Sequence, residues 1–265
     1  MRLATWNVNS ARPRIDRIVD ELKRQSIDVL AMQETKCRDD QFPEEAFREA
    51  GYEVAHHGLN QWNGVAIASR IGLGDVRAGF GGQPGFAKDP DAEQPPEARH
   101  IAATCGGVRV HSLYVPNGRE IGDRHYDYKL RFLEALAGSC RDALDDDPDL
   151  RAVLVGDFNI APRDEDVWDI GFFEGRTHVT APERDAFAAL EDAGFVDVTR
   201  RFTEGGWTYW DYQAGRFDRG QGMRIDFQLA SPALAATAAG GFIDVDERIG
   251  KGCSDHAPVI VDYAV

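Results

Sequence analysis

Short runs of consecutive apolar residues recur along this chain, separated by polar segments. Each run is too short for a membrane span and has the continuous apolar character of a strand that is buried on both faces of its sheet. The runs cover residues 3–6, 27–32, 64–69, 108–115, 152–155, 225–230 and 259–261. Because polar residues stand directly at the ends of several runs, the pattern predicts a buried sheet with chemistry at its edges.

Three other segments have apolar residues at the spacing of an amphipathic helix. Residues 12–25 and 126–144 each carry an apolar stripe with positions three and four residues apart. A third helix is predicted to start at the capping box formed by Thr180 and Glu183, and to end at Gly194.

Helices interspersed among short buried strands are typical of an α/β fold. We expect a four-layer sandwich in which two stacked mixed β-sheets are flanked by helices. Residues 79–99 are rich in Gly and Pro, but strand patterns resume on both sides, so they predict a long loop and not a linker. The chain shows no repeat, and residues 1–265 are predicted to form a single domain.

Composition indicates a protein with a sizeable core and no membrane span. Hydrophobic residues make up 43% of the 265 positions, which is enough for a sizeable core. No apolar stretch approaches the ~20 residues of a membrane span, and residues 1–7 enter a strand pattern at once, which leaves no room for a signal peptide. Four cysteines without a C-x-x-C pair indicate reduced thiols, and therefore a cytoplasmic location. They are Cys37, Cys105, Cys140 and Cys253.

The net charge is −15, from 30 basic and 45 acidic residues. Contacts with nucleic-acid phosphates favour a basic surface, so this balance argues against a large and tight nucleic-acid interface. A local basic patch can nevertheless coexist with an acidic remainder. Charge therefore weighs against DNA as a partner without deciding the question.

Glu34 follows directly after the apolar run 27–32. A carboxylate held rigidly at the end of a buried strand suits a hard divalent cation such as Mg²⁺ or Mn²⁺. Mg²⁺ keeps most of its waters and binds one or two protein carboxylates. The alternative from the residues alone is a solvent-facing glutamate that caps the next turn.

Asp157 and Asn159 stand at the end of another apolar run. In an extended chain they share one face, because side chains alternate, and they could hold one water between them. The alternative is an Asx turn that closes the strand.

His256 lies in the tripeptide Ser254-Asp255-His256 at the start of the last strand, and Asp226 interrupts a buried run. A buried carboxylate is costly unless it is paired, so Asp226 is a candidate partner for His256. A protonated histidine paired in this way would stabilise charge on a phosphate under attack. The alternative is a histidine with a purely structural role.

Taken in order, these segments resemble the exonuclease III family of AP endonucleases, within the endonuclease/exonuclease/phosphatase superfamily. The resemblance runs from residue 3 to about residue 262. It is carried by Asn7, 33–35, 114–117, 156–159, 224–226 and 254–258. The segments that narrow the superfamily to exonuclease III are 33–36, 126–132 and 207–212.

The resemblance implies a role for each matching residue. The implied metal-binding residues are Asn7, Glu34 and Asp255. The implied catalytic residues are Tyr114, Asp157, Asn159, Asp226 and His256. The residues predicted to contact substrate are Asn117, Tyr209, Trp210, Arg99 and Lys129, of which Tyr209 and Trp210 are implied to form a pocket for a sugar lacking its base. For that aromatic pair, the alternative is ordinary core packing.

The resemblance also implies an activity. We expect an Mg²⁺-dependent phosphodiesterase, with Mn²⁺ as an alternative ion, that cleaves 5′ to abasic sites in duplex DNA and has 3′-to-5′ exonuclease and 3′-end-processing activity. Its expected partner is duplex DNA with abasic sites or 3′ ends, it should work as a monomer, and it should have no membrane partner. Two alternatives are hydrolysis of a non-DNA phosphoester by the same fold, and a DNA-binding member that has lost catalysis.

Overall fold

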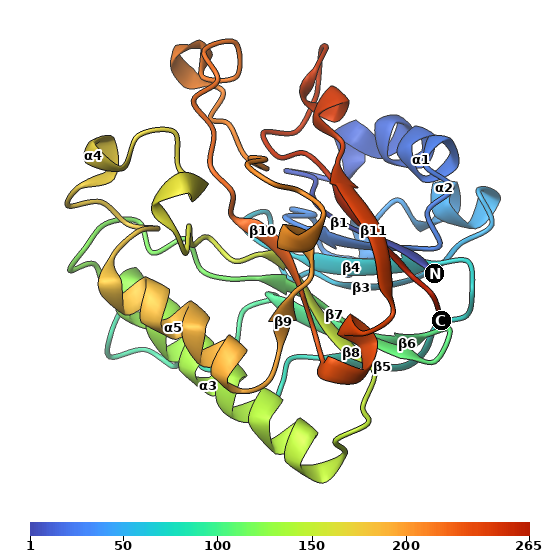
Figure 1. Ribbon diagram of the computed structural model, residues 1–265, viewed down its shortest axis with the longest axis horizontal. Coiled ribbons are helices and arrows are strands. Elements are labelled where there is room, and N and C mark those ends of the chain that lie inside the picture. Colours follow the sequence, from blue (N-terminus) through green and yellow to red (C-terminus); the bar gives the residue numbers. More distant parts are fainter.

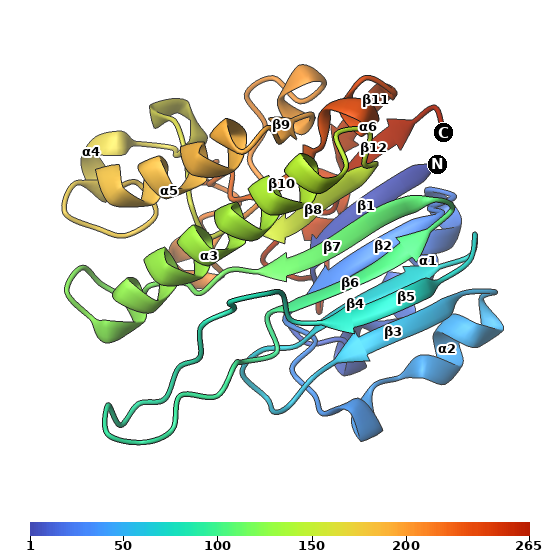
Figure 2. The ribbon, with the colours of Figure 1, turned by 90° about the horizontal axis from the view of Figure 1, so that it is seen from below.

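The computed structural model describes residues 1–265, which form two six-stranded sheets stacked face to face (Figures 1 and 2). Sheet A contains, in spatial order, β11 (Ala238–Ile243), β12 (Val259–Tyr263), β1 (Arg2–Asn7), β2 (Val29–Gln33), β4 (Val65–Ser69) and β3 (Glu53–His57). Sheet B contains β5 (Gly74–Ala78), β6 (His100–Cys105), β7 (Val108–Tyr114), β8 (Ala152–Asp157), β10 (Asp226–Ala230) and β9 (Val196–Asp197). Both sheets are mixed, as predicted.

Helices cover the outer face of each sheet, which completes the predicted four layers. On sheet A, α1 (Ile15–Arg24) and α2 (Glu44–Glu49) pack through a buried cluster that includes Ile18 and Phe47. On sheet B, α3 (Arg124–Asp146) and α5 (Ala181–Asp192) lie side by side (Figure 2). The short elements are α4 (Ile170–Phe173), α6 (Pro232–Ala235) and the 3-10 turns Arg12–Arg14, Asp39–Gln41, Asp164–Asp166, Thr199–Arg201, Gln213–Gly215 and Val245–Arg248.

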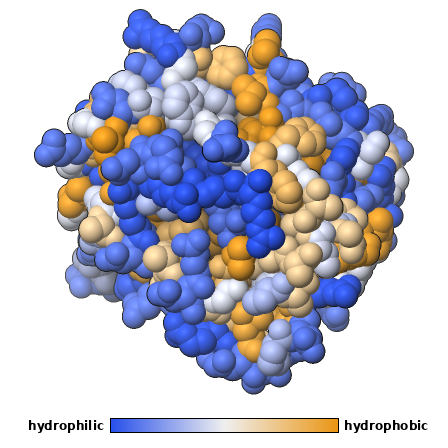
Figure 3. Space-filling model, in the orientation of Figure 1, coloured by the Kyte–Doolittle hydropathy of each residue, from blue (hydrophilic) through white to orange (hydrophobic).

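All the strands expected from apolar runs are present. Strands β3, β5, β9 and β11 carry no such signal in the sequence, and β6 was missed although it contains the short apolar run 101–103. The five residues of β5 are all exposed, and β11 contains the poor strand formers Ala and Gly. In Figure 3 the part of the surface where β11 lies in Figure 1 is pale orange to white, the colours of weakly hydrophobic and neutral residues. Strands β3, β5, β9 and β11 lie at sheet edges, so pairing with a neighbour, and not local preference, determines their conformation.

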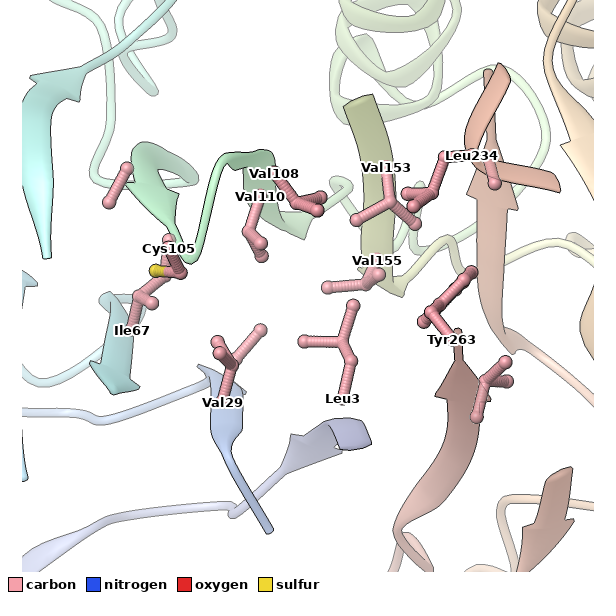
Figure 4. Packing of buried hydrophobic residues seen from close by; sticks show 14 of the residues in the cluster. Leu3, Val29, Ile67, Cys105, Val108, Val110, Val153, Val155, Leu234 and Tyr263 are labelled. Carbon is pink, nitrogen blue, oxygen red and sulfur yellow. The ribbon is translucent and has the colours of Figure 1, made fainter. Parts of the chain in front are cut away.

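The core between the sheets consists of aliphatic side chains from both inner faces. Figure 4 shows Leu3 and Val29 of sheet A directed toward Val110, Val153 and Val155 of sheet B. This packing fixes the two sheets relative to each other, because interdigitated side chains allow little sliding.

Strand direction brings the polar residues to one end of the sandwich. Strand β1 runs parallel to β2, and β7 runs parallel to β8, so the carboxyl ends of each pair lie together. Strands β10 and β12 run antiparallel to these, so they begin at the same end. No helix is both long and apolar enough to cross a membrane.

Gly156 in β8 lies too close to β7 for any other residue. It has φ +147°, and an added Cβ would lie 1.9 Å from the carbonyl oxygen of Leu113 on β7. Gly156→Ala must therefore push β7 and β8 apart, and we expect a loss of about 1–3 kcal/mol of unfolding free energy, measured by urea denaturation. Gly138→Ala in α3 is the control: no atom lies within 4 Å of its added Cβ, so stability should hold or rise. Equal urea midpoints for Gly156→Ala and the wild type would contradict this account.

Glu21 of α1 should make the stability of the folded protein depend on pH. It is fully buried beside Asp244 and Glu247 and pairs with Arg24. Burial, together with Asp244, raises the pKa of Glu21 from 4.5 to about 8. The folded protein thus holds a proton that the unfolded chain releases, so this stabilisation is complete below pH 4.5 and is lost as the pH rises through about 8. In thermal melts, the melting temperature of Glu21→Gln should fall less between pH 4.5 and pH 8 than that of the wild type. The same pH dependence in both proteins would contradict this role of Glu21.

Candidate active site

Asn7, at the end of β1, connects the two sheets at the end where the polar residues gather. Its side chain is fully buried. Its Nδ2 group donates one hydrogen bond to Glu34 Oε1 at 2.9 Å and another to Asp157 Oδ2 at 3.0 Å. Glu34 follows β2 of sheet A and Asp157 ends β8 of sheet B. The structure thus brings together three residues that lie up to 150 positions apart in the chain.

Glu34 is held in an uncommon backbone conformation with φ +53°. Its carbonyl oxygen accepts a hydrogen bond from the Ser10 amide at 2.7 Å, and Thr35 donates to Gly64 at 3.1 Å, so neighbouring loops fix the turn. Burial alone would raise the pKa of Glu34, but Lys36, with Nζ 2.6 Å from Oε2, and the Asn7 amide lower it. Glu34 is therefore an ionised, largely buried carboxylate and not a solvent-facing cap.

Asp226 and His256 form the pair expected from the sequence. His256 Nδ1 donates to Asp226 Oδ2 at 2.8 Å, and both side chains are buried. Thr208 Oγ1 donates to the same oxygen at 2.6 Å. Burial disfavours the charged imidazole, yet Asp226, with a further contribution from Asp157, raises the pKa of His256 to about 10. His256 is thus an imidazolium at neutral pH, with Nε2 3.8 Å from Asp157 Oδ2.

Asp157 and Asn159 do not share a face of an extended chain, contrary to the sequence prediction. Asn159 has φ +52°, and its amide donates to Asp157 Oδ1 at 2.9 Å, which is the Asx turn. The Asn159 side chain donates to the Val115 carbonyl at 3.0 Å and accepts from Asn117 at 3.0 Å. Asn159 therefore positions the loop around Asp157 and Asn117. Burial, then the nearby Asp226 and Glu34 carboxylates, raise the pKa of Asp157.

His178 was missed from the sequence, although it lies in the centre of this loop cluster. Its Nε2 is 3.2 Å from Asn117 Nδ2 and 3.2 Å from Asn159 Oδ1. Burial, followed by the Lys129 charge, lowers the pKa of His178 to about 3, so the ring is neutral. A lone histidine in a loop carries no spacing signal; its position just before the capping box of α5 was the only available hint.

Tyr114 ends β7 beside Glu34. Burial and that carboxylate raise the pKa of Tyr114 well above its usual value, so its hydroxyl remains a hydrogen-bond donor at neutral pH. Arg99, predicted to contact a DNA phosphate, is instead only 5% exposed. Its guanidinium lies 4.8 Å from the Tyr114 ring centroid and pairs with Glu97 at 2.6 Å. Because it is buried and paired, Arg99 supports Tyr114 and does not face substrate.

Lys129 was also predicted to contact substrate, and here too the structure differs. Its side chain is fully buried, with Nζ 2.5 Å from Glu183 Oε1 and 2.5 Å from the Asn159 carbonyl oxygen. Nζ also donates to the Asn117 carbonyl at 3.3 Å. An ammonium with three internal acceptors has no donor left for DNA. Lys129 instead fastens the two asparagine loops to α3 and α5.

Of the predicted aromatic pair, Tyr209 borders a cavity and Trp210 is buried. Its ring centroid lies 4.8 Å from that of His256, and it lines a cavity of about 490 Å³ together with Met223. Trp210 is 5% exposed and packs at 5.2 Å against Phe217, so it belongs to the supporting layer. Ordinary packing thus describes Trp210, whereas Tyr209 faces open space beside the histidine.

Asp255 has different partners from those expected of a metal ligand next to Glu34. Its Oδ1 accepts a hydrogen bond from Asn9 Nδ2 at 2.9 Å, and Asn9 in turn accepts one from Lys36 at 2.6 Å. Asp255 therefore joins Glu34 only indirectly, through Asn9 and Lys36.

The residues present fit a divalent metal ion. Asp157 and Asp226 each place a carboxylate oxygen within 4.8 Å of the other, whereas the protonated His256 beside them acts as a hydrogen-bond donor and not as a ligand. One buried oxygen of Asp226, Oδ1, has no hydrogen-bond partner. The Glu34 carboxylate adds a third negative charge held next to Asp157 by Asn7. Crowded carboxylate oxygens of this kind are the donor set of a hard cation, which would relieve their mutual repulsion.

This combination of a two-sheet α/β sandwich with crowded carboxylates and a charged histidine defines a class, the metal-assisted phosphoester hydrolases. The model of the Endonuclease/Exonuclease/phosphatase family matches residues 4–256, and the chain belongs to this family. An exodeoxyribonuclease of Bacillus subtilis (strain 168) is 31% identical over 98% of each chain.

Solved structures of two DNA-processing enzymes are similar to this protein along the whole chain. The 3′ phosphatase NExo from Neisseria, bound to a product DNA hairpin, is 35% identical with a TM-score of 0.91 over 100% of both chains. An AP endonuclease from Archaeoglobus fulgidus gives the same identity, TM-score and coverage. The predicted resemblance to exonuclease III is confirmed, and with it the prediction of a hydrolytic DNA-repair nuclease.

A substitution of Lys129 can distinguish a structural role from a role in binding substrate. Lys129→Met leaves the Glu183 charge buried without a partner, so we expect a loss of about 3–5 kcal/mol of unfolding free energy, measured by urea denaturation. The double variant Lys129→Met/Glu183→Leu should regain part of that loss, because it removes both charges. A single variant with wild-type stability but weakened DNA affinity would instead restore the substrate-contact interpretation.

Proposed function

We propose that this protein is a divalent-metal-dependent phosphodiesterase that cleaves DNA 5′ to abasic sites and also processes 3′ ends. The observation that carries the proposal is the Asn7 bridge. It holds the Glu34 and Asp157 carboxylates together at 2.9 and 3.0 Å, beside an imidazolium paired with Asp226. The relatives named as an exodeoxyribonuclease, a 3′ phosphatase and an AP endonuclease support the choice of DNA as substrate.

In the proposed reaction, water attacks the phosphorus atom, the bond from phosphorus to the 3′ oxygen breaks, and the products are a 3′ hydroxyl and a 5′ phosphate. Asp157 accepts the proton of the attacking water; its raised pKa suits a base better than an ordinary aspartate does. His256, fixed by Asp226, donates from Nε2 to a phosphoryl oxygen. Tyr114, whose hydroxyl stays protonated at neutral pH, gives its proton to the leaving 3′ oxygen, which completes the 3′ hydroxyl, and Asn117 supplies a further donor to the phosphate.

The metal would be held by Glu34, with Asn7 and Asp255 nearby, and when bound it would supply charge neutralisation at the phosphoryl oxygens. Mg²⁺ is the proposed ion and Mn²⁺ a substitute, because the donors are oxygens. The cavity beside His256, with Tyr209 and Met223 in its wall, is proposed to receive the sugar at the cleavage point. We further propose that residues 1–265 act as one domain, as a monomer, in the cytoplasm.

Cleavage assays test this function directly. With Mg²⁺, the protein should cleave a duplex containing an abasic site and should process recessed or 3′-phosphate ends, and EDTA should abolish every one of these activities. Asp157→Asn and His256→Gln should each lower kcat/KM at least about 100-fold. The matched control is Asp146→Asn at the exposed end of α3, which should behave like the wild type.

Two outcomes would contradict the proposal. Faster turnover of an inositol phosphate or sphingomyelin than of any DNA substrate would favour another phosphoester. Absence of cleavage with both Mg²⁺ and Mn²⁺, together with retained DNA binding, would indicate a catalytically silent member of the family.

A further inference from the structure

Four side chains beside the Tyr209 cavity form an aromatic and arginine cluster, which we call the stacking cluster: Trp168, Phe172, Arg176 and Arg216. The Trp168 and Phe172 ring centroids are 4.9 Å apart. The Arg176 Cζ atom lies 4.2 Å from the Phe172 centroid, and Arg216 Cζ lies 4.8 Å from Phe172 and 5.4 Å from Trp168. Each guanidinium is thereby held close to a ring.

The two arginines of the stacking cluster lack ion-pair partners, although the chain carries a net charge of −15. The only side-chain hydrogen bond to either guanidinium joins Arg216 Nη1 to the neutral Gln221 at 3.0 Å. Two acidic residues, Glu120 and Asp211, line the same cavity, but neither forms an ion pair with Arg176 or Arg216, and Asp211 Oδ1 accepts a hydrogen bond from the Gln213 amide at 2.8 Å. The cluster therefore offers positive charge and aromatic surface together, the combination that binds single-stranded nucleic acid.

The stacking cluster and the reaction centre open into one cavity. All four cluster residues line the cavity of about 490 Å³ that also contacts Tyr209, Met223 and His178. The Tyr209 ring centroid lies 4.8 Å from that of His256, and His178 Nε2 lies 3.2 Å from Asn117 Nδ2, so these two lining residues adjoin the proposed reaction centre. In Figure 1, α4, which carries Phe172, and the loop that follows Tyr209 stand at the same end of the molecule.

We propose that the stacking cluster binds an unpaired nucleobase of the DNA whose backbone lies at the reaction centre. This inference rests on the proposed function and names a substrate class for it: an unpaired nucleotide that still carries its base, such as one at a 3′ end. A cavity of about 490 Å³ lies within the roughly 300–1,000 Å³ of pockets that enclose whole small ligands. A sugar without a base would reach Tyr209 and leave the aromatic and guanidinium surfaces uncovered.

A binding experiment in EDTA tests the proposal without requiring cleavage. The probes are two fluorescent DNA hairpins that differ only in the last 3′ residue, which is either one unpaired nucleotide or a tetrahydrofuran that lacks a base. Fluorescence anisotropy should give about tenfold tighter binding of the base-bearing hairpin, equivalent to ~1.4 kcal/mol. The measured quantity is this ratio, because general charge effects act equally on both hairpins.

Two variants remove the stacking surface in different ways. Phe172→Leu keeps the charge and most of the packing, and the double variant Arg176→Ala/Arg216→Ala removes surface charges with little packing; both should lower the ratio to about one. The control Arg77→Ala, an exposed arginine on β5, should keep the wild-type ratio. Thermal melts of each variant establish that the fold is intact.

The inference is overturned if the wild type binds both hairpins equally, or if both variants keep the wild-type ratio. Either result leaves the proposed function standing, provided that the abasic duplex is cleaved in Mg²⁺. Conversely, an intact ratio in a protein that cleaves no DNA would support the base-binding site and reject the hydrolytic activity.

Discussion

The amide of Asn7 is the interaction on which the site depends. It donates to a carboxylate carried by each sheet, Glu34 on one side and Asp157 on the other. Both hydrogen bonds require that the sheets stack in one position, and the aliphatic core between them sets that position. In this protein, packing far from the site and chemistry within it are therefore linked through one buried side chain.

Three pairs of opposite charges are buried around the site. Asp226 neutralises His256, Lys129 meets Glu183, and Arg99 meets Glu97. The first pair shapes reactivity, because Asp226 keeps the imidazole protonated. The other pairs hold the loops around the site, since an unpaired buried charge would cost several kcal/mol. Negative charge left over at Glu34 and Asp157 is what makes the site suited to a cation.

The sequence predicted the residues at the ends of buried strands well. Glu34, Asp157 and Asp226 each interrupt or end an apolar run, so their positions at strand ends follow from local pattern alone. Long charged side chains were predicted poorly. Arg99 and Lys129 were assigned to substrate as candidates for contacts with backbone phosphates, and only the three-dimensional packing around them reveals their internal partners. His178 was missed for a related reason, since a loop residue acquires its neighbours only from tertiary structure.

The sequence by itself determined the fold class, the family and most of the polar residues of the site, because apolar runs and their end residues are local features. Tertiary structure decided which of these residues meet. It joined Glu34 and Asp157 through Asn7, buried Lys129 against Glu183, and separated Tyr209 from Trp210. It also assembled Trp168, Phe172 and Arg216 into one wall across about 50 residues of sequence. Such contacts depend on the stacking of the sheets and the paths of the loops, which no local pattern in the chain encodes.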